Sequence, residues 1–179
     1  IGASIVGGVC NNSGGSLVQR GPAYTELALY ARVNENGKLE LINELGINLG
    51  DNPETILKNL QNKNYNDRDI IYNNKLASDD KYSKIVRGID EDTPARYNSD
   101  KRLLYGASGS SGKLVVFALR LDTYPKPKNN KVFYLGTNNP DIFWKLRREI
   151  LSKFKNLPTL GDYLQRDGYD AAMKYSKDN

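Results

Sequence analysis

Four stretches of the chain have patterns of apolar residues that are typical of β-structure. Residues 27–33 and 39–42 are rich in strand formers, and Asn36-Gly37 between them is a strong turn signal, which predicts a β-hairpin. Residues 114–121 are apolar almost throughout, so we expect a strand buried on both faces. Residues 131–136 predict a further strand.

A second pattern, with apolar residues three or four positions apart, predicts helices. Asn52-Pro53 is typical of a helix start, and that helix should end near Asn62. Asn139-Pro140 predicts the start of an amphipathic helix that packs on the strand at 131–136. A weak helical stretch follows at 169–175. The apolar positions of the amphipathic helix are Ile142, Leu146, Ile150 and Phe154.

Three stretches lack either pattern. Residues 1–21 are rich in glycine, asparagine and serine, which predicts tight turns with exposed N–H groups, suited to a phosphate or a flat cofactor. Residues 61–101 are polar with isolated apolar pairs, so we expect a long, partly mobile excursion pinned at a few points. Residues 124–130 are rich in proline and lysine, as in a connection between domains.

Composition narrows the chemistry available. The 179 residues have room for one ordinary domain, and no apolar run reaches the length of a membrane-spanning helix. There is no histidine and a single cysteine, Cys10, which excludes Ser-His or Cys-His nucleophiles, an internal disulfide and a multi-cysteine metal site in this chain. The chain begins inside a glycine motif, without a methionine or a secretory leader, so we expect an excerpt of a longer protein.

The net charge of +5 is unevenly distributed. Residues 1–100 hold 11 basic and 14 acidic residues, whereas residues 101–179 hold 15 basic and 7 acidic ones, a net of +8. A net positive charge on residues 101–179 can attract nucleic acid or an anionic membrane surface, or the basic residues can simply form a solvated surface. A non-catalytic basic module is therefore one candidate function. Against nucleic acid, the nearby aromatic residues are expected on the apolar faces of a strand and a helix, away from any stacking platform.

Residues 9–26, read as VCNNSGGSLVQRGPAYTE, carry a resemblance to a known family. They closely resemble the FAD-containing, quinone-dependent D-lactate dehydrogenases, flavoproteins of the vanillyl-alcohol-oxidase type. The family's Gly-Gly-x-x-x-x-Asn-x-Gly-Gly stretch corresponds to residues 7–15, with one residue fewer before the asparagine if Asn12 is that residue. Further similar stretches follow in the same order, at 92–98, 112–114, 117–123, 133–138 and 156–158.

The resemblance implies an α+β fold in three parts. Residues 1–122 would be the later part of a vanillyl-alcohol-oxidase-type FAD-binding domain, residues 123–164 the start of an α/β cap domain over the substrate, and residues 165–179 the entry to a membrane-associated segment. It also implies oxidation of D-lactate to pyruvate by hydride transfer to FAD, with electrons passed to a membrane quinone. The implied location is the cytoplasmic side of a bacterial inner membrane, with peripheral attachment to the anionic membrane surface. The resemblance implies no nucleic-acid partner.

The resemblance also assigns roles to particular residues. Ser4 and Gly14 correspond to flavin-contacting loop positions, and Val116 to a strand position whose backbone meets the cofactor. Gly8 is a weaker candidate for close approach to FAD. A serine hydroxyl and glycine N–H groups are donors suited to phosphate or flavin carbonyl oxygens. The catalytic residues, including the family's histidines, are expected outside these 179 residues.

Two other residues near the glycine segment have alternative interpretations. Cys10 is expected to be a small buried residue. No covalent link from Cys10 to the flavin is expected, so the FAD is predicted to be non-covalent. Arg20 is equally suited to a bidentate contact with a carboxylate or phosphate and to a structural ion pair.

Overall fold

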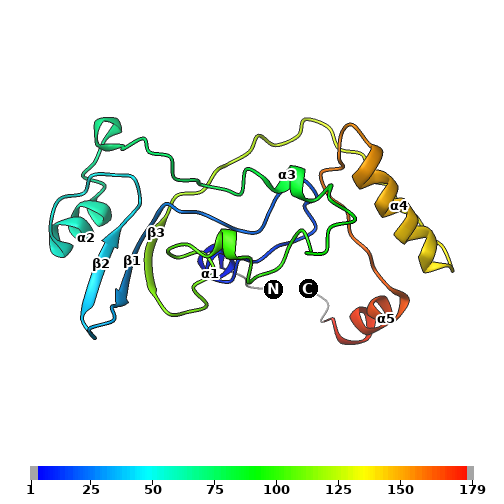
Figure 1. The fold of residues 1–179 in the computed structure, drawn as a ribbon, viewed down its shortest axis with the longest axis horizontal. Coiled ribbons are helices and arrows are strands. Elements are labelled where there is room, and N and C mark those ends of the chain that lie inside the picture. Colours follow the sequence, from blue (N-terminus) through cyan, green and yellow to red (C-terminus); the bar gives the residue numbers. More distant parts are fainter. Residues whose placement is uncertain (1–3, 177–179) are drawn as a thin grey trace.

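The chain folds around a small sheet at one end and a pair of helices at the other. The computed structural model describes residues 4–176. Figure 1 shows the sheet and α2 at one end of an elongated molecule, α4 and α5 at the other, and α1 and α3 between them. The elements in chain order are α1 (Ile5–Cys10), β1 (Ala28–Val33), β2 (Leu39–Asn43), α2 (Pro53–Asn62), η1 (Asp67–Asp69), α3 (Tyr82–Ile85), η2 (Lys101–Leu103), β3 (Val115–Leu119), α4 (Pro140–Lys153) and α5 (Arg166–Tyr175).

The sheet is antiparallel, with β1 in the centre between β2 and β3. The predicted hairpin is confirmed: β1 and β2 pair in register, with Tyr30 opposite Ile42. Gly37 adopts φ +74° in the turn, a conformation that a residue without a Cβ takes at little cost. The β1–β3 pairing shifts register between Leu29 and Tyr30, so Tyr30 lies opposite Val116.

A strand forms within residues 114–121, as expected, but the expectation that it is buried on both faces is wrong. β3 is an edge strand, and Val115 and Phe117 are 60% and 45% exposed, whereas Val116 and Ala118 are half-buried or packed against the core. Apolar residues on both faces indicate burial only when something covers both faces, and within residues 4–176 one face of β3 is open.

The two capped helices form where the sequence predicts them. The Asn52 side chain accepts a hydrogen bond from the Thr55 N–H at the start of α2, which ends at Asn62. The Asn139 side chain accepts one from the Asp141 N–H at the start of α4. Each cap satisfies a backbone donor that the first helical turn leaves free. The weak helix also forms, as α5, and none of its residues is buried.

The strand predicted at residues 131–136 is absent from the structure. This segment has no regular secondary structure and pairs with no strand among residues 4–176. Its apolar residues are 61–94% exposed; they are Val132, Phe133, Tyr134 and Leu135. Helix α4 therefore does not pack on it, and the buried residue of α4 is Leu151. Phe133 and Tyr134 are exposed and lie on no strand, so the expectation that the aromatics near the basic residues lie on the apolar face of a strand is also wrong. A strand needs a partner, and the local pattern does not supply one.

The glycine-rich N-terminal segment contains a helix as well as the predicted turns. Residues 5–10 form α1 because the Ser4 hydroxyl caps it, accepting from the Gly7 N–H at 3.0 Å, and because Val9 on its inner face is fully buried. Capping and burial outweigh the low helix propensity of two adjacent glycines. The turns that were expected follow after Cys10.

The excursion at residues 61–101 is pinned at a few points, as expected. Ile70 forms an isolated bridge with Ile47, and the Ile71 N–H donates to the Gly46 carbonyl at 2.9 Å. Further along, Tyr82 and Val86 are buried. Between these contacts the segment is mostly irregular, so its mobility stays a prediction.

Three apolar clusters hold the fold together. One lies between the sheet and α2 around Leu29, a second joins α1 to β1 and β3 around Val9 and Tyr30, and a third joins α3 to α4 around Tyr82 and Leu151. The second cluster positions the glycine-rich segment against the sheet. No helix within residues 4–176 has both the length and the apolar character needed to cross a membrane.

Candidate functional site: the glycine loop

Helix α1 and the loop after it form the candidate site. We call residues 13–21 the glycine loop. The Ser13 N–H donates to the Gly8 carbonyl at 2.8 Å, so the loop turns back over α1. Leu17 then forms an isolated bridge with Leu160, which ties the loop to the segment between α4 and α5. The loop therefore contacts both α1 and the segment that connects α4 to α5.

Asn12, the candidate motif asparagine, fixes the start of the glycine loop. It is fully buried with φ +45°, a left-handed conformation that asparagine tolerates better than most residues. Its Nδ2 donates to the carbonyls of Leu103 at 3.0 Å and Asn98 at 3.4 Å. The Gly109 N–H donates to the Val9 carbonyl nearby, so the second glycine-rich turn packs on the end of α1. Asn12 therefore has a structural role beneath the loop.

Gly14 and Gly15 lie on the exposed side of the loop. Neither N–H donates to a backbone carbonyl within residues 4–176, so both are available donors. A Cβ at Gly15 would meet nothing within 4 Å, whereas one at Gly14 would lie 2.1 Å from Cδ of Arg96. Ser4 is also exposed, and its hydroxyl proton stays free because the cap uses only an oxygen lone pair. Two of the predicted residues, Ser4 and Gly14, thus have donors exposed to solvent.

Gly8 and Val116 are placed differently. The Gly8 N–H donates to the Ser4 carbonyl inside α1, and a Cβ there would lie at an ordinary 3.7 Å from Ala23. Val116 packs with Val9 in the second apolar cluster, and β3, on which it lies, has one edge that pairs with no other strand among residues 4–176. The structure thus joins Val116 to α1 through the core. The predicted contact of each residue with FAD stays a prediction.

Arg96 is the residue that sequence reasoning missed. Its guanidinium donates to three carbonyls of the glycine loop, those of Gly15, Leu17 at 3.1 Å and Arg20 at 2.6 Å. It lies 4.6 Å above the ring of Tyr82. Its bonds reach about 80 residues back along the chain, so no local pattern reveals them. The only signal in the sequence is its place in the family-like stretch 92–98.

Arg20 stacks on an aromatic ring, and Cys10 is less buried than expected. The Arg20 guanidinium lies 3.1 Å from the ring centroid of Tyr124, and within residues 4–176 it forms no ion pair, whereas its contact with a phosphate stays a prediction. Cys10 is half-buried at the end of α1, with its carbonyl accepting from the Ser111 N–H. The structure therefore gives Arg20 a stacking role.

A charged network lies between β2 and the excursion. Lys75 Nζ is 2.6 Å from Glu44 Oε1 and 2.6 Å from the Tyr105 hydroxyl, which itself donates to Glu44 at 2.9 Å. Burial alone would raise the pKa of Glu44, but these hydrogen bonds outweigh it and hold that pKa below its usual range. Burial and the Glu44 charge both raise the pKa of Tyr30, whose hydroxyl faces Glu44 Oε2 at 3.3 Å.

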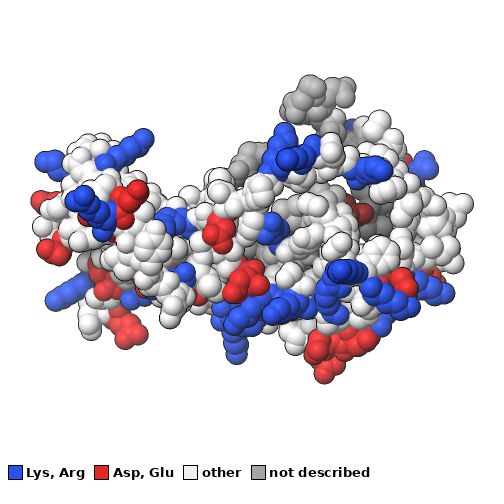
Figure 2. Space-filling view, turned by 90° about the horizontal axis from the view of Figure 1, so that it is seen from above, with Lys and Arg blue, Asp and Glu red and all other residues white. Residues whose placement is uncertain are grey.

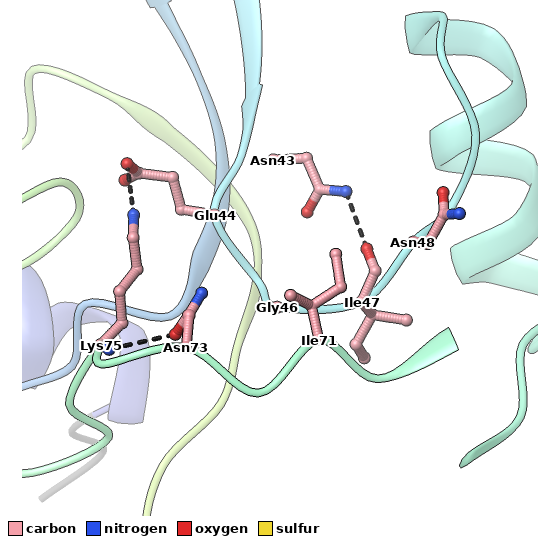
Figure 3. A pocket seen from close by; sticks show the side chains of 8 residues that line it. All are labelled: Asn43, Glu44, Gly46, Ile47, Asn48, Ile71, Asn73 and Lys75. Atoms are coloured by element: carbon pink, nitrogen blue, oxygen red, sulfur yellow. Dashed lines mark hydrogen bonds and ion pairs between the residues drawn. The ribbon is translucent and has the colours of Figure 1, made fainter. Parts of the chain in front are cut away.

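A pocket of about 340 Å³ opens beside this network. Figure 3 shows Lys75 extended toward Glu44 and the Asn43 amide directed at the Ile47 carbonyl. The lining asparagines are bonded to their own loops, since Asn73 accepts from the Lys75 N–H. The polar groups of the pocket thus stabilise turns, and none of the predicted flavin-contacting residues lines it. The lining residues are Asn43, Glu44, Gly46, Ile47, Asn48, Ile71, Asn73 and Lys75.

The surface charge is mixed. Figure 2 shows Lys and Arg spread over the visible face and densest along its lower edge, where acidic groups interrupt them. In the sequence, the basic excess is concentrated in residues 101–131, with 7 basic and 1 acidic residue, whereas residues 132–179 hold 8 and 6. The positive charge is therefore greatest around the proline-rich connection.

Two kinds of comparison with known proteins bear on this site. A family described as "D-lactate dehydrogenase, membrane binding" matches residues 132–179, which include α4 and α5. The chain is 56% identical over 178 residues to the quinone-dependent D-lactate dehydrogenase of Escherichia coli K12, 55% to that of Haemophilus influenzae Rd and 46% to that of Corynebacterium glutamicum. These alignments cover 99% of this chain and 31–32% of each relative, so the chain spans about a third of their length.

The comparisons confirm the resemblance that the glycine segment predicts. Over nearly all of its residues, the chain is similar to about a third of each of three enzymes named quinone-dependent D-lactate dehydrogenase.

Proposed function

We propose that this chain is part of a respiratory D-lactate dehydrogenase that oxidises D-lactate to pyruvate, with non-covalent FAD as hydride acceptor and a membrane quinone as the final electron acceptor. The observation that carries the proposal is the identity of 46–56% over 178 residues to enzymes named for this reaction. Bound FAD supplies the redox chemistry, and the protein binds it, orients it and excludes water.

The donors on the glycine loop fit such a cofactor. The N–H groups of Gly14 and Gly15 and the hydroxyl of Ser4 are exposed donors of the kind that binds phosphate or flavin carbonyl oxygens. Gly15 has open space above it, which permits close approach of a flat ligand. The open edge of β3 next to Val116 offers backbone groups to an adenine ring. These features support residues 1–122 as part of an FAD-binding domain.

The membrane part of the proposal rests on the later residues. The family match over residues 132–179 is described as membrane binding, which supports attachment through these residues. Residues 123–164 would begin the cap over the substrate, and residues 165–179 would enter the membrane-associated segment. Attachment would be peripheral, to the anionic cytoplasmic face of a bacterial inner membrane, and the exposed lysines of the neighbouring proline-rich connection would add electrostatic attraction. D-lactate, the quinone and this lipid surface are the proposed partners, and nucleic acid is not.

A visible spectrum and a turnover assay of the full-length protein test the proposal. We expect the absorption bands of oxidised flavin, their bleaching by D-lactate and much slower bleaching by L-lactate, and reoxidation by a soluble quinone analogue. A colourless protein that FAD does not reconstitute would refute it. Purified residues 1–179 with added FAD should not oxidise D-lactate, because they contain no histidine for proton transfer and only part of the proposed cofactor site.

A further inference from the structure

Arg96 contacts the glycine loop more extensively than any predicted residue does. The three carbonyls to which it donates, those of Gly15, Leu17 and Arg20, lie within six residues that form neither helix nor a named strand. A guanidinium presents several donors in one rigid plane, so a single side chain can fix a run of backbone in this way.

The loop is also shaped to accept this side chain. Gly14 does not adopt a positive φ, so its backbone is one that alanine could take. A Cβ there would nevertheless lie 2.1 Å from Arg96 Cδ and 2.8 Å from Nε. An alanine at position 14 would therefore displace the Arg96 side chain from its present position.

Arg96 is itself held in place from below. Its guanidinium stacks on Tyr82, which is 5% exposed and packs in the third apolar cluster with Val86, Leu151 and Leu157. Ala95, next to it in the chain, packs against the same cluster. A stacked and packed arginine loses little freedom when it binds, so it can impose its geometry on a loop that has no regular structure.

The charge of Arg96 is not cancelled by a carboxylate. Within residues 4–176 it forms no ion pair, and its Nε is buried without an acceptor. Its bonds go to carbonyl oxygens of the loop alone. An arginine used only for surface solubility would not be arranged in this way.

From this geometry we infer that Arg96 is the positioning residue of the cofactor site: it holds the glycine loop in the form in which the Gly14 and Gly15 N–H groups face the FAD. The inference rests on the proposed function, since it names the residue that orders the proposed FAD-binding loop. Arg96 itself acts through the loop.

The test is a double-mutant cycle in the full-length protein, with the FAD dissociation constant measured by fluorescence quenching on reconstitution of the apoprotein. Arg96→Ala and Gly14→Ala should each weaken FAD binding by about tenfold or more, because several hydrogen bonds to the loop are lost or displaced. The double variant should be no weaker than the worse single variant, since both changes remove the same contact. Arg96→Lys keeps the charge without the planar fork and should recover only part of the affinity.

The matched control is Arg87→Ala. Arg87 also donates to two backbone carbonyls, of Leu151 at 3.0 Å and Lys155 at 3.2 Å, and neither of these belongs to the glycine loop. The Arg87→Ala variant should lower the unfolding midpoint of the apoprotein as much as Arg96→Ala does. Its FAD affinity should stay within about twofold of the wild-type value. Unchanged FAD affinity in Arg96→Ala, additive effects in the cycle, or equal loss of affinity in Arg87→Ala would each overturn the inference. A wild-type protein that binds no FAD would instead refute the proposed function.

Discussion

Replacement of Asn12 tests whether the asparagine beneath the glycine loop is structural. Asn12→Gly removes the amide that donates to the Leu103 carbonyl at 3.0 Å and to the Asn98 carbonyl at 3.4 Å, and it keeps a backbone that tolerates φ +45°. Buried carbonyls left without a donor cost about 1–3 kcal/mol. Asn12→Ala loses the same bonds and must also hold a Cβ at positive φ, which adds about 1 kcal/mol.

The assay is urea unfolding of the full-length protein, followed by far-UV circular dichroism and by flavin release. We expect the midpoint to fall in the order wild type, Asn12→Gly, Asn12→Ala, with the slope unchanged. Asn11→Ala is the matched control, because Asn11 is exposed and its amide donates to the nearby Ser13 hydroxyl. It should change stability by less than about 0.5 kcal/mol. Asn12→Gly as stable as wild type, or equal stability of the two Asn12 variants, would refute the reasoning.

Three further predictions concern other parts of the molecule. Because the folded pKa of Glu44 is depressed, its ion pair with Lys75 stabilises the fold above the unfolded pKa of about 4.3 and loses this effect as pH falls through the folded pKa. Glu44→Gln should therefore lower the thermal midpoint at neutral pH and flatten its decline in acid; parallel curves for both proteins would contradict this. Leu29→Ala, at a fully buried position, should cost about 2–5 kcal/mol in urea unfolding, whereas Val33→Ala, at an exposed strand position, should be nearly neutral, and a similar loss in both would disprove the assigned core. Membrane attachment should weaken with salt in vesicle sedimentation, since each exposed basic residue near an anionic leaflet contributes about 1 kcal/mol. Equal binding to anionic and neutral vesicles at every salt concentration would show that the basic excess is plain solvated surface.

Features decided by neighbours in the chain could be predicted from the sequence, and features decided by distant contacts could not. The caps at Asn52 and Asn139 and the Asn36-Gly37 turn depend on hydrogen bonds and backbone angles within a few residues. The burial of β3 depends on what covers the sheet, and Arg96 acts through bonds that span about 80 residues. At the candidate site, the glycine-rich sequence and its resemblance to a known family predicted the position of the loop. The contacts of Arg96 with that loop could be found only in the three-dimensional structure.

The open edge of β3 has a consequence for handling these residues as an isolated piece. An edge strand exposes a row of unpaired N–H and C=O groups, and here Val115 and Phe117 beside that edge are also exposed. Residues 132–135 add a second extended apolar stretch of strand-forming character. Separate copies of the chain would thus present each other with matching templates for intermolecular sheet growth. Soluble expression of residues 1–179 would call for a lysine in place of Phe117, which puts a charge beside the edge that self-association would use.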